Sequence, residues 1–177
     1  MKLILHIGSD KTGTTAIQSA LHKNRELLAS KRVLYPKLNL SDHHGCLVIE
    51  LRDGKQGSAW KKLNKQIGNT TSDVLIISSE AFCTLSKKDI KLLGEWLNPD
   101  NVTVICYLRS ADQYLESGFM QRLKDSKSDQ DFSRLYLMAR FLPAAISPIV
   151  YQAGLKNRFV LSWQKNYSPK KMVVRQY

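Results

Sequence analysis

One short segment combines the residue types that bind phosphate. Residues 8–15, GSDKTGTT, follow an apolar run over residues 2–7 and precede a helical pattern. The two glycines let the backbone curl tightly, and the amino end of the next helix offers N–H groups and a positive dipole end. Lys11 adds a positive charge, and Thr14 and Thr15 add hydroxyls. The segment predicts a phosphate-binding loop, the alternative being an ordinary strand-to-helix turn.

Two other places offer groups for acid–base chemistry. Glu80 follows Ser78 and Ser79 directly after an apolar run. A carboxylate there could take a proton from an acceptor hydroxyl, or it could simply be an acidic residue favoured by the dipole of the helix that starts nearby. His43 and His44 precede Gly45 and form the second candidate, either of them as the base. Their alternative is an exposed surface pair.

Metal binding is not expected. No set of His, Asp and Glu has a recognisable ligand spacing, and the three cysteines, Cys46, Cys83 and Cys106, form no CxxC pair. They suggest neither a zinc site nor a disulfide framework, which fits a reducing cytoplasm. His6 lies inside the first apolar run, where we expect a core histidine or one that supports a neighbouring group.

Alternating apolar runs and amphipathic stretches must position these groups. Continuous β-branched runs separated by helices predict an α/β fold with a parallel sheet flanked by helices, whose ligands bind beyond the carboxyl ends of the strands. Ser86, with Asp89 three residues later, predicts a capping box. Strands are expected at residues 2–7, 33–36, 73–78, 102–108 and 172–175, and helices at 14–28, 43–51, 58–67, 86–97, 111–124, 131–142 and, with breaks, 143–163.

Composition and charge limit the class of protein. The chain has 177 residues and 43% hydrophobic residues, enough for one globular domain over residues 1–177. No apolar run approaches the ~20 residues that a membrane helix needs. The formal charge of +12 favours an anionic partner. Because the aromatic residues are scattered, no platform for stacking bases is evident, and nucleic acid is not the partner we expect.

The loop resembles a known family in its residue order. It is not a Walker A motif, because Lys11 precedes Gly13 instead of following the last glycine. KTGTT after HIG is similar to the 5′-phosphosulfate loop of sulfotransferases that use PAPS (3′-phosphoadenosine 5′-phosphosulfate), and residues 6–18 look like their bacterial branch. Arg109 at a strand end, with Ser117 eight positions later, resembles the 3′-phosphate site of that family. Taken alone, that pair would be a strand-end Arg and a solvated Ser.

The resemblance implies the sulfotransferase variant of the P-loop NTPase-like fold. It also implies sulfuryl transfer as the reaction. A sulfuryl group would pass from PAPS to a hydroxyl or amine, with a carbohydrate as the favoured acceptor. Glu80 resembles the general base of glycan-modifying relatives, and His43 or His44 could serve instead, as in cytosolic relatives. The implied cofactor-binding residues are Lys11, Thr12, Gly13, Thr14 and Thr15 for the 5′-phosphate side, and Arg109 and Ser117 for the 3′-phosphate.

The sequence departs from the family's pattern in one respect, and two alternative functions stay open. Family members usually continue beyond a strand like residues 172–177, so we expect the chain to lack the family's C-terminal segment and to expose apolar surface there. A P-loop kinase or NTPase is the first alternative, with Glu80 holding Mg²⁺. A non-catalytic binder of anionic ligands, driven by the net charge, is the second.

Overall fold

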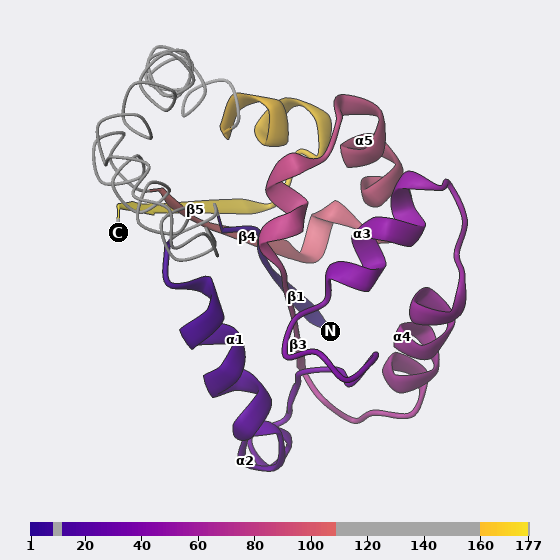
Figure 1. Cartoon of the computed structure of the whole chain (residues 1–177), viewed down its shortest axis with the longest axis vertical. Coiled ribbons are helices and arrows are strands. Elements are labelled where there is room, and N and C mark those ends of the chain that lie inside the picture. The colour runs from indigo at the N-terminus through magenta and orange to yellow at the C-terminus, as the bar shows by residue number, and fades with distance from the viewer. Residues whose placement is uncertain (9–11, 109–159, 177) are drawn as a thin grey trace, which may run out of the picture.

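Five parallel strands lie among the residues that the structure describes. The computed structural model describes residues 1–8, 12–108 and 160–176. The strands stand in the order β2-β3-β1-β4-β5, so β1 is central (Figure 1). Every pair is parallel, and the carboxyl ends of the strands therefore open at one edge of the sheet. The strands are β1 (Lys2–His6), β2 (Val33–Leu34), β3 (Val74–Ser78), β4 (Val102–Leu108) and β5 (Lys171–Gln176).

Apolar side chains on the inner strands explain the order of the sheet. Leu5 in β1 is paired with Ile77 of β3 on one side and Val104 of β4 on the other, and all three side chains are fully buried. Burying one such side chain stabilises a fold by about 1.5–3 kcal/mol. The predicted α/β architecture with a parallel sheet is confirmed.

The helices divide into two groups. In Figure 1, α3, α4 and α5 lie together beside the strands, whereas α1 and α2 lie apart from them at the lower left. The first group supplies apolar side chains to the core, but the buried residues of α1 are the polar Thr14 and Gln18. The bounds are α1 (Thr14–Lys23), α2 (Arg25–Ser30), α3 (Gly45–Arg52), α4 (Ser58–Gly68) and α5 (Lys87–Trp96), with 3₁₀ turns η1 (Glu80–Thr84) and η2 (Pro99–Asn101).

The helical residues 160–166 pack against α5, beside which they lie in Figure 1. Trp163 is fully buried, and the Tyr167 hydroxyl donates to the Leu97 carbonyl over 3.2 Å. The Tyr167 ring lies over Gly94 of α5, 3.7 Å from where a Cβ would be. The chain then enters β5 at the edge of the sheet. The helices expected over 111–124, 131–142 and most of 143–163 lie outside the described residues.

The helix expected over residues 14–28 is broken. Helix α1 ends at Lys23 and α2 starts at Arg25, with Asn24 between them outside helical geometry. The Asn24 side-chain amide donates to the Ala20 carbonyl over 2.8 Å, a local bond that competes with the helix. The Arg25 guanidinium donates to the carbonyls of Tyr35 and Pro36, each over 3.1 Å, and this anchors the second piece.

The starts of helices α5 and α3 can be compared with the starts predicted from the sequence. The capping box of Ser86 and Asp89 is present at α5, as predicted. Helix α3, however, starts at Gly45 instead of His43, because His44 leaves helical geometry to bind β3. His44 is thereby placed at the end of β3.

Candidate functional site

Buried polar side chains gather where β1 and β3 end. Leaving a buried polar group without a partner costs about 1–3 kcal/mol, so such a cluster is held by hydrogen bonds or by a ligand. Among the described residues, the buried polar side chains lie at the ends of β1 and β3, on the segments that follow these two strands, on the early turns of α1 and, for His44, directly before α3. They are His6, Thr12, Thr14, Gln18, His44, Ser78 and Ser79.

The connection from β1 to α1 is built for close backbone approach. Gly13 precedes α1 in the left-handed region, with φ of 70° and ψ of 14°, where an L residue is strained. Its carbonyl accepts from the amides of Ala16 and Ile17 at 3.1 and 3.3 Å, which starts the helix. The amides of the preceding residues in the first turn are not used by the helix ladder and project from its amino end.

Gly8 shows how tightly this connection packs. A Cβ at Gly8 would lie 2.6 Å from Thr14 Cγ2, 3.1 Å from His6 Nε2 and 3.4 Å from Thr12 Oγ1. The first distance is shorter than two carbon atoms tolerate, so only glycine fits. The backbone after β1 therefore lies directly against the buried Thr14 side chain and the His6 ring.

Gln18 ties α1 to the end of β3. Its amide nitrogen donates to Glu80 Oε2 over 2.8 Å. Glu80 is half-buried and opens η1, whose first turn is capped by the Ser79 hydroxyl accepting from the Ala81 amide over 3.2 Å. The carboxylate is thus held next to the helix that follows the glycine-containing loop, with one oxygen bound to Gln18.

His6 ends β1 in a buried setting. Its Nδ1 lies 2.7 Å from the Ser78 hydroxyl of the neighbouring strand, and its ring contacts Tyr107 edge to face at 5.6 Å between centroids. Burial lowers the pKa of His6, and the negative charge of Glu80 partly opposes that shift. His6 Nε2 is buried and has no hydrogen-bond partner among the described residues.

His44 is a structural residue and does not belong to an exposed pair. Its Nδ1 accepts from the Ser78 amide over 3.0 Å, and its Nε2 lies 2.9 Å from the Pro36 carbonyl. These partners fix a neutral ring with the proton on Nε2, and burial lowers the pKa of His44 to about 4. With both nitrogens engaged, His44 cannot serve as a base.

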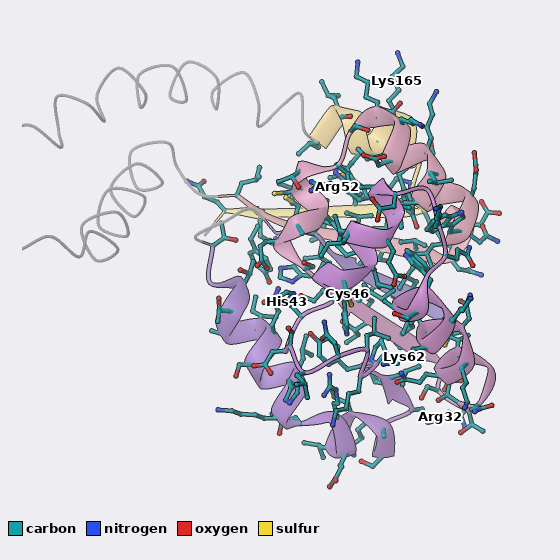
Figure 2. The ribbon with its side chains drawn as sticks, turned by 45° about the vertical axis from the view of Figure 1, so that its right-hand side comes forward. Arg32, His43, Cys46, Arg52, Lys62 and Lys165 are labelled. Carbon is teal, nitrogen blue, oxygen red and sulfur yellow. The ribbon has the colours of Figure 1, made fainter. Side chains whose placement is uncertain are left out.

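His43 stands at the margin of the cluster. Its Nδ1 accepts from the Gly45 amide over 3.1 Å, and the ring is half-buried. Figure 2 shows it with Cys46 near the amino end of α3, while Arg52 lies at the far end of that helix. A Cβ at Gly45 would lie 3.0 Å from the His43 ring and 3.5 Å from Ser79 Oγ, so both side chains lie close to Gly45.

Comparison with known proteins leaves the family open. No model of a known protein family matches the chain. The chain is similar to a protein of Archaeoglobus fulgidus described as uncharacterized, with 38% identity over 64 residues. That alignment covers 35% of this chain and spans 18% of the length of the archaeal protein.

The described residues account for part of the predicted site. Thr12, Gly13, Thr14 and Glu80 lie together at the carboxyl edge of the sheet, while Thr15 is exposed on α1. Lys11, Arg109 and Ser117 lie outside the described residues. Strand β4 runs beside β1 over residues 102–105 and ends at Leu108.

Gln18 and Ser78 of the cluster, and Tyr35 beside it, were not predicted as site residues. Gln18 lies four positions after Thr14, a spacing that places both on one helix face and could have identified it. Ser78 binds His6 and His44, and Tyr35 packs on the His44 ring at 4.6 Å between centroids. Burial raises the pKa of Tyr35 to about 12, so the phenol stays neutral, and it donates to the Asp42 carbonyl. No local sequence signal distinguished these two residues.

The described residues contain neither a metal-binding cluster nor a membrane-spanning helix. No group of three His, Cys, Asp or Glu side chains in that part of the chain is placed to hold a metal ion. No helix within residues 1–8, 12–108 and 160–176 is long and apolar enough to cross a lipid bilayer. The chemistry that the cluster offers is anion binding by backbone amides and proton transfer by a carboxylate or an imidazole.

Proposed function

We propose that this protein is a sulfotransferase of P-loop-like architecture that binds PAPS and transfers its sulfuryl group to a hydroxyl or amine acceptor. The observation that carries the proposal is the tie between Gln18 and Glu80. It holds a carboxylate beside the helix whose amino end follows the glycine-containing loop. An anion-binding element and a proton acceptor thus stand next to each other.

The loop supplies the anion-binding element. The left-handed Gly13 and the crowded Gly8 bring the backbone against α1, whose first-turn amides and dipole favour negative charge. In the proposal the amides of residues 12–15, with the Thr14 and Thr15 hydroxyls, hold the 5′-phosphate. The central place of β1 in a parallel sheet supports this, since ligands of such sheets bind at the carboxyl ends of the strands.

Glu80 supplies the proton acceptor. One carboxylate oxygen is bound by Gln18, and the group lies at the carboxyl end of β3, next to the loop. Glu80 takes the proton from the acceptor hydroxyl as that oxygen forms its bond to sulfur. The bond between sulfur and the phosphate oxygen breaks in the same step, and 3′,5′-ADP leaves with the electron pair.

The remaining roles fall to residues beyond the described ranges. Lys11 neutralises charge on the departing phosphate, and Arg109 with Ser117 binds the 3′-phosphate, because a guanidinium forks onto phosphate oxygens and a hydroxyl adds one more hydrogen bond. His43 is the second candidate base, since its half-buried ring lies next to Gly45 at the margin of the cluster. The net charge of +12 supports an acidic carbohydrate as acceptor.

Calorimetric titration with 3′,5′-ADP tests the proposal, with 5′-ADP and ATP plus Mg²⁺ as comparison ligands. We expect 3′,5′-ADP to bind at least about tenfold more tightly than 5′-ADP, a preference that Arg109→Ala removes. Arg52→Ala is the matched control, because it removes the same charge from an exposed position at the far end of α3 (Figure 2). Preference for ATP with Mg²⁺ would support a kinase or NTPase instead. An affinity that falls steeply as the salt concentration rises, and that neither Arg109→Ala nor Arg52→Ala changes, would indicate a non-catalytic anion binder.

A further inference from the structure

His6 is a buried imidazole with one ring nitrogen hydrogen-bonded and the other without a hydrogen-bond partner among the described residues. The residue is 4% exposed, and Nδ1 lies 2.7 Å from Ser78 Oγ. Nε2 is without a hydrogen-bond partner among the described residues and lies 3.1 Å from where a Cβ of Gly8 would be. That same point is 3.4 Å from Thr12 Oγ1. The unsatisfied nitrogen therefore lies beside Gly8, and the Thr12 hydroxyl and the Thr14 side chain lie close to the same residue.

A buried polar atom with no partner carries a free-energy cost, and this one sits where a ligand would relieve it. A neutral imidazole has one N–H, whereas the protonated ring donates from both nitrogens. The protonated ring could donate through Nδ1 to Ser78 and through Nε2 toward the loop. Burial opposes that charge when the loop holds no anion, and a bound anion would supply both an acceptor and a countercharge.

We propose that His6 is a positioning residue that takes up one proton when an anion binds at the amino end of α1, so that anion binding is coupled to the protonation of Nε2. The proposal rests on the proposed anion-binding function of the loop. It goes beyond that function by assigning a role to a histidine that neither the phosphate contacts nor the base requires. The anion class is a phosphate or sulfate group.

The groups that surround His6 are compatible with this role. Glu80, in η1, is the charged group whose potential favours the protonated ring. Tyr107 of β4 contacts the ring edge to face. His44 binds the Ser78 amide, and Tyr35 packs on the His44 ring. Both stay neutral near pH 7, because burial raises the pKa of Tyr35 to about 12 and lowers the pKa of His44 to about 4. Of these three rings, His6 is therefore the one whose charge an anion would change.

Sulfate is the first probe, because it has no titrating group between about pH 5 and pH 8, the range in which a histidine changes charge. Calorimetry of the whole chain in two buffers of different ionisation enthalpy measures the protons taken up. We expect an uptake that approaches one proton per sulfate. The association constant for sulfate should then fall by up to about tenfold for each unit by which the pH rises. 3′,5′-ADP is titrated in parallel at a single pH as a tighter ligand.

Two substitutions separate the two ring nitrogens. His6→Asn keeps a group near the Nδ1 position that can bind Ser78, and His6→Gln places an amide near the Nε2 position. Both should abolish proton uptake and flatten the pH dependence, and His6→Gln should retain more affinity than His6→Asn. His22→Gln is the matched control, because His22 lies in the last turn of α1 and should leave the linkage intact. Thermal unfolding checks that each variant folds.

The wild-type protein keeps the proposal falsifiable if the variants do not fold. The imidazole resonances of His6, followed by NMR across pH, should titrate at least about one pH unit higher with saturating sulfate than without it. Sulfate binding without proton uptake, and with no shift in that titration, overturns the role of His6 and leaves the anion site standing. If sulfate binds at none of the pH values and 3′,5′-ADP does not bind at the pH at which it is titrated, the proposed function fails and this inference fails with it.

Discussion

Gln18 donates a hydrogen bond of 2.8 Å to Glu80 across 62 residues of chain. The bond joins the helix after the glycine-containing loop to the end of the neighbouring strand β3. An amide donor fixes the carboxylate without adding charge, so Glu80 keeps one oxygen available for a proton. Movement at the amino end of α1 and the position of the proposed base are therefore linked.

The role of Glu80 is tested by replacing it while keeping its shape. Glu80→Gln should lower the rate of sulfuryl transfer by about 10²–10⁴-fold, because an amide cannot accept the proton. The affinity for 3′,5′-ADP should change little, and a radioactive or coupled assay with equilibrium titration separates the two quantities. Gln18→Ala is the companion variant and should lower the rate less, since the carboxylate remains. Full activity in Glu80→Gln would move the base role to His43.

The close packing at Gly8 predicts a stability defect. Gly8→Ala places a methyl group 2.6 Å from Thr14 Cγ2, which is buried and cannot withdraw without moving α1. We expect the free energy of unfolding to fall by about 1–3 kcal/mol, measured by urea denaturation. The matched control is Gly68→Ala at the end of α4, where a Cβ meets no atom within 4 Å. That substitution should be neutral or stabilising by up to about 1 kcal/mol. Equal losses in both variants would contradict the packing argument.

The buried His44 predicts a loss of stability in mild acid. Its pKa in the folded protein is about 4, against 6.5 for the unfolded chain, because burial disfavours the charged ring. Between these values the unfolded state binds more protons, so stability is complete above about pH 6.5 and declines as the pH falls toward 4. The loss contributed by this residue is about 3 kcal/mol in total. Urea midpoints across pH measure it.

NMR provides the check on the assignment to His44. Its imidazole signals should not titrate above about pH 5 in the folded protein. In His44→Gln the decline between about pH 6.5 and 4 should be smaller, although the variant starts from lower stability because it loses the bonds to Ser78 and Pro36. A His44 resonance that titrates near 6.5 would show that the ring is accessible and refute this prediction.

Glu50 affects the stability of the fold in a lower pH range, because its carboxylate binds the amino end of α4. Burial alone would raise the pKa of Glu50, but the amides of Ala59 and Trp60, at 2.9 and 3.2 Å, outweigh burial and hold it below its usual value. A depressed carboxyl pKa stabilises the fold above the unfolded value, and the contribution disappears as the pH falls through the folded value. Glu50→Ala should cost about 1 kcal/mol at pH 7, with a smaller difference from wild type below about pH 4.

A matched carboxylate controls for net charge in that experiment. Glu95 is exposed on α5, and Glu95→Ala removes the same charge away from any helix amino end. Its effect on the urea midpoint should stay within about 0.5 kcal/mol at every pH. If the two variants lose the same stability, the effect reflects overall charge and not the cap of α4.

Local sequence signals determined the elements of this protein and the place of the loop. The apolar runs of β1, β3 and β4, the capping box at Ser86 and the glycine-containing loop all depend on neighbours within a few residues. Such patterns set the backbone geometry before any distant contact forms, so the parallel sheet and the edge where its strands end were predictable. The same signals did not predict the break at Asn24, which depends on Arg25 reaching the carbonyls of Tyr35 and Pro36.

Tertiary packing decided which polar groups meet at that edge. His6 and Ser78 are 72 residues apart in the chain, and His44 bonds across 34 residues to the Ser78 amide. A lone histidine or serine has no period that reveals its partner, because the register between β1 and β3 chooses it. Burial then sets the protonation of each ring, since the cost of charge depends on what surrounds the side chain and not on its neighbours in sequence.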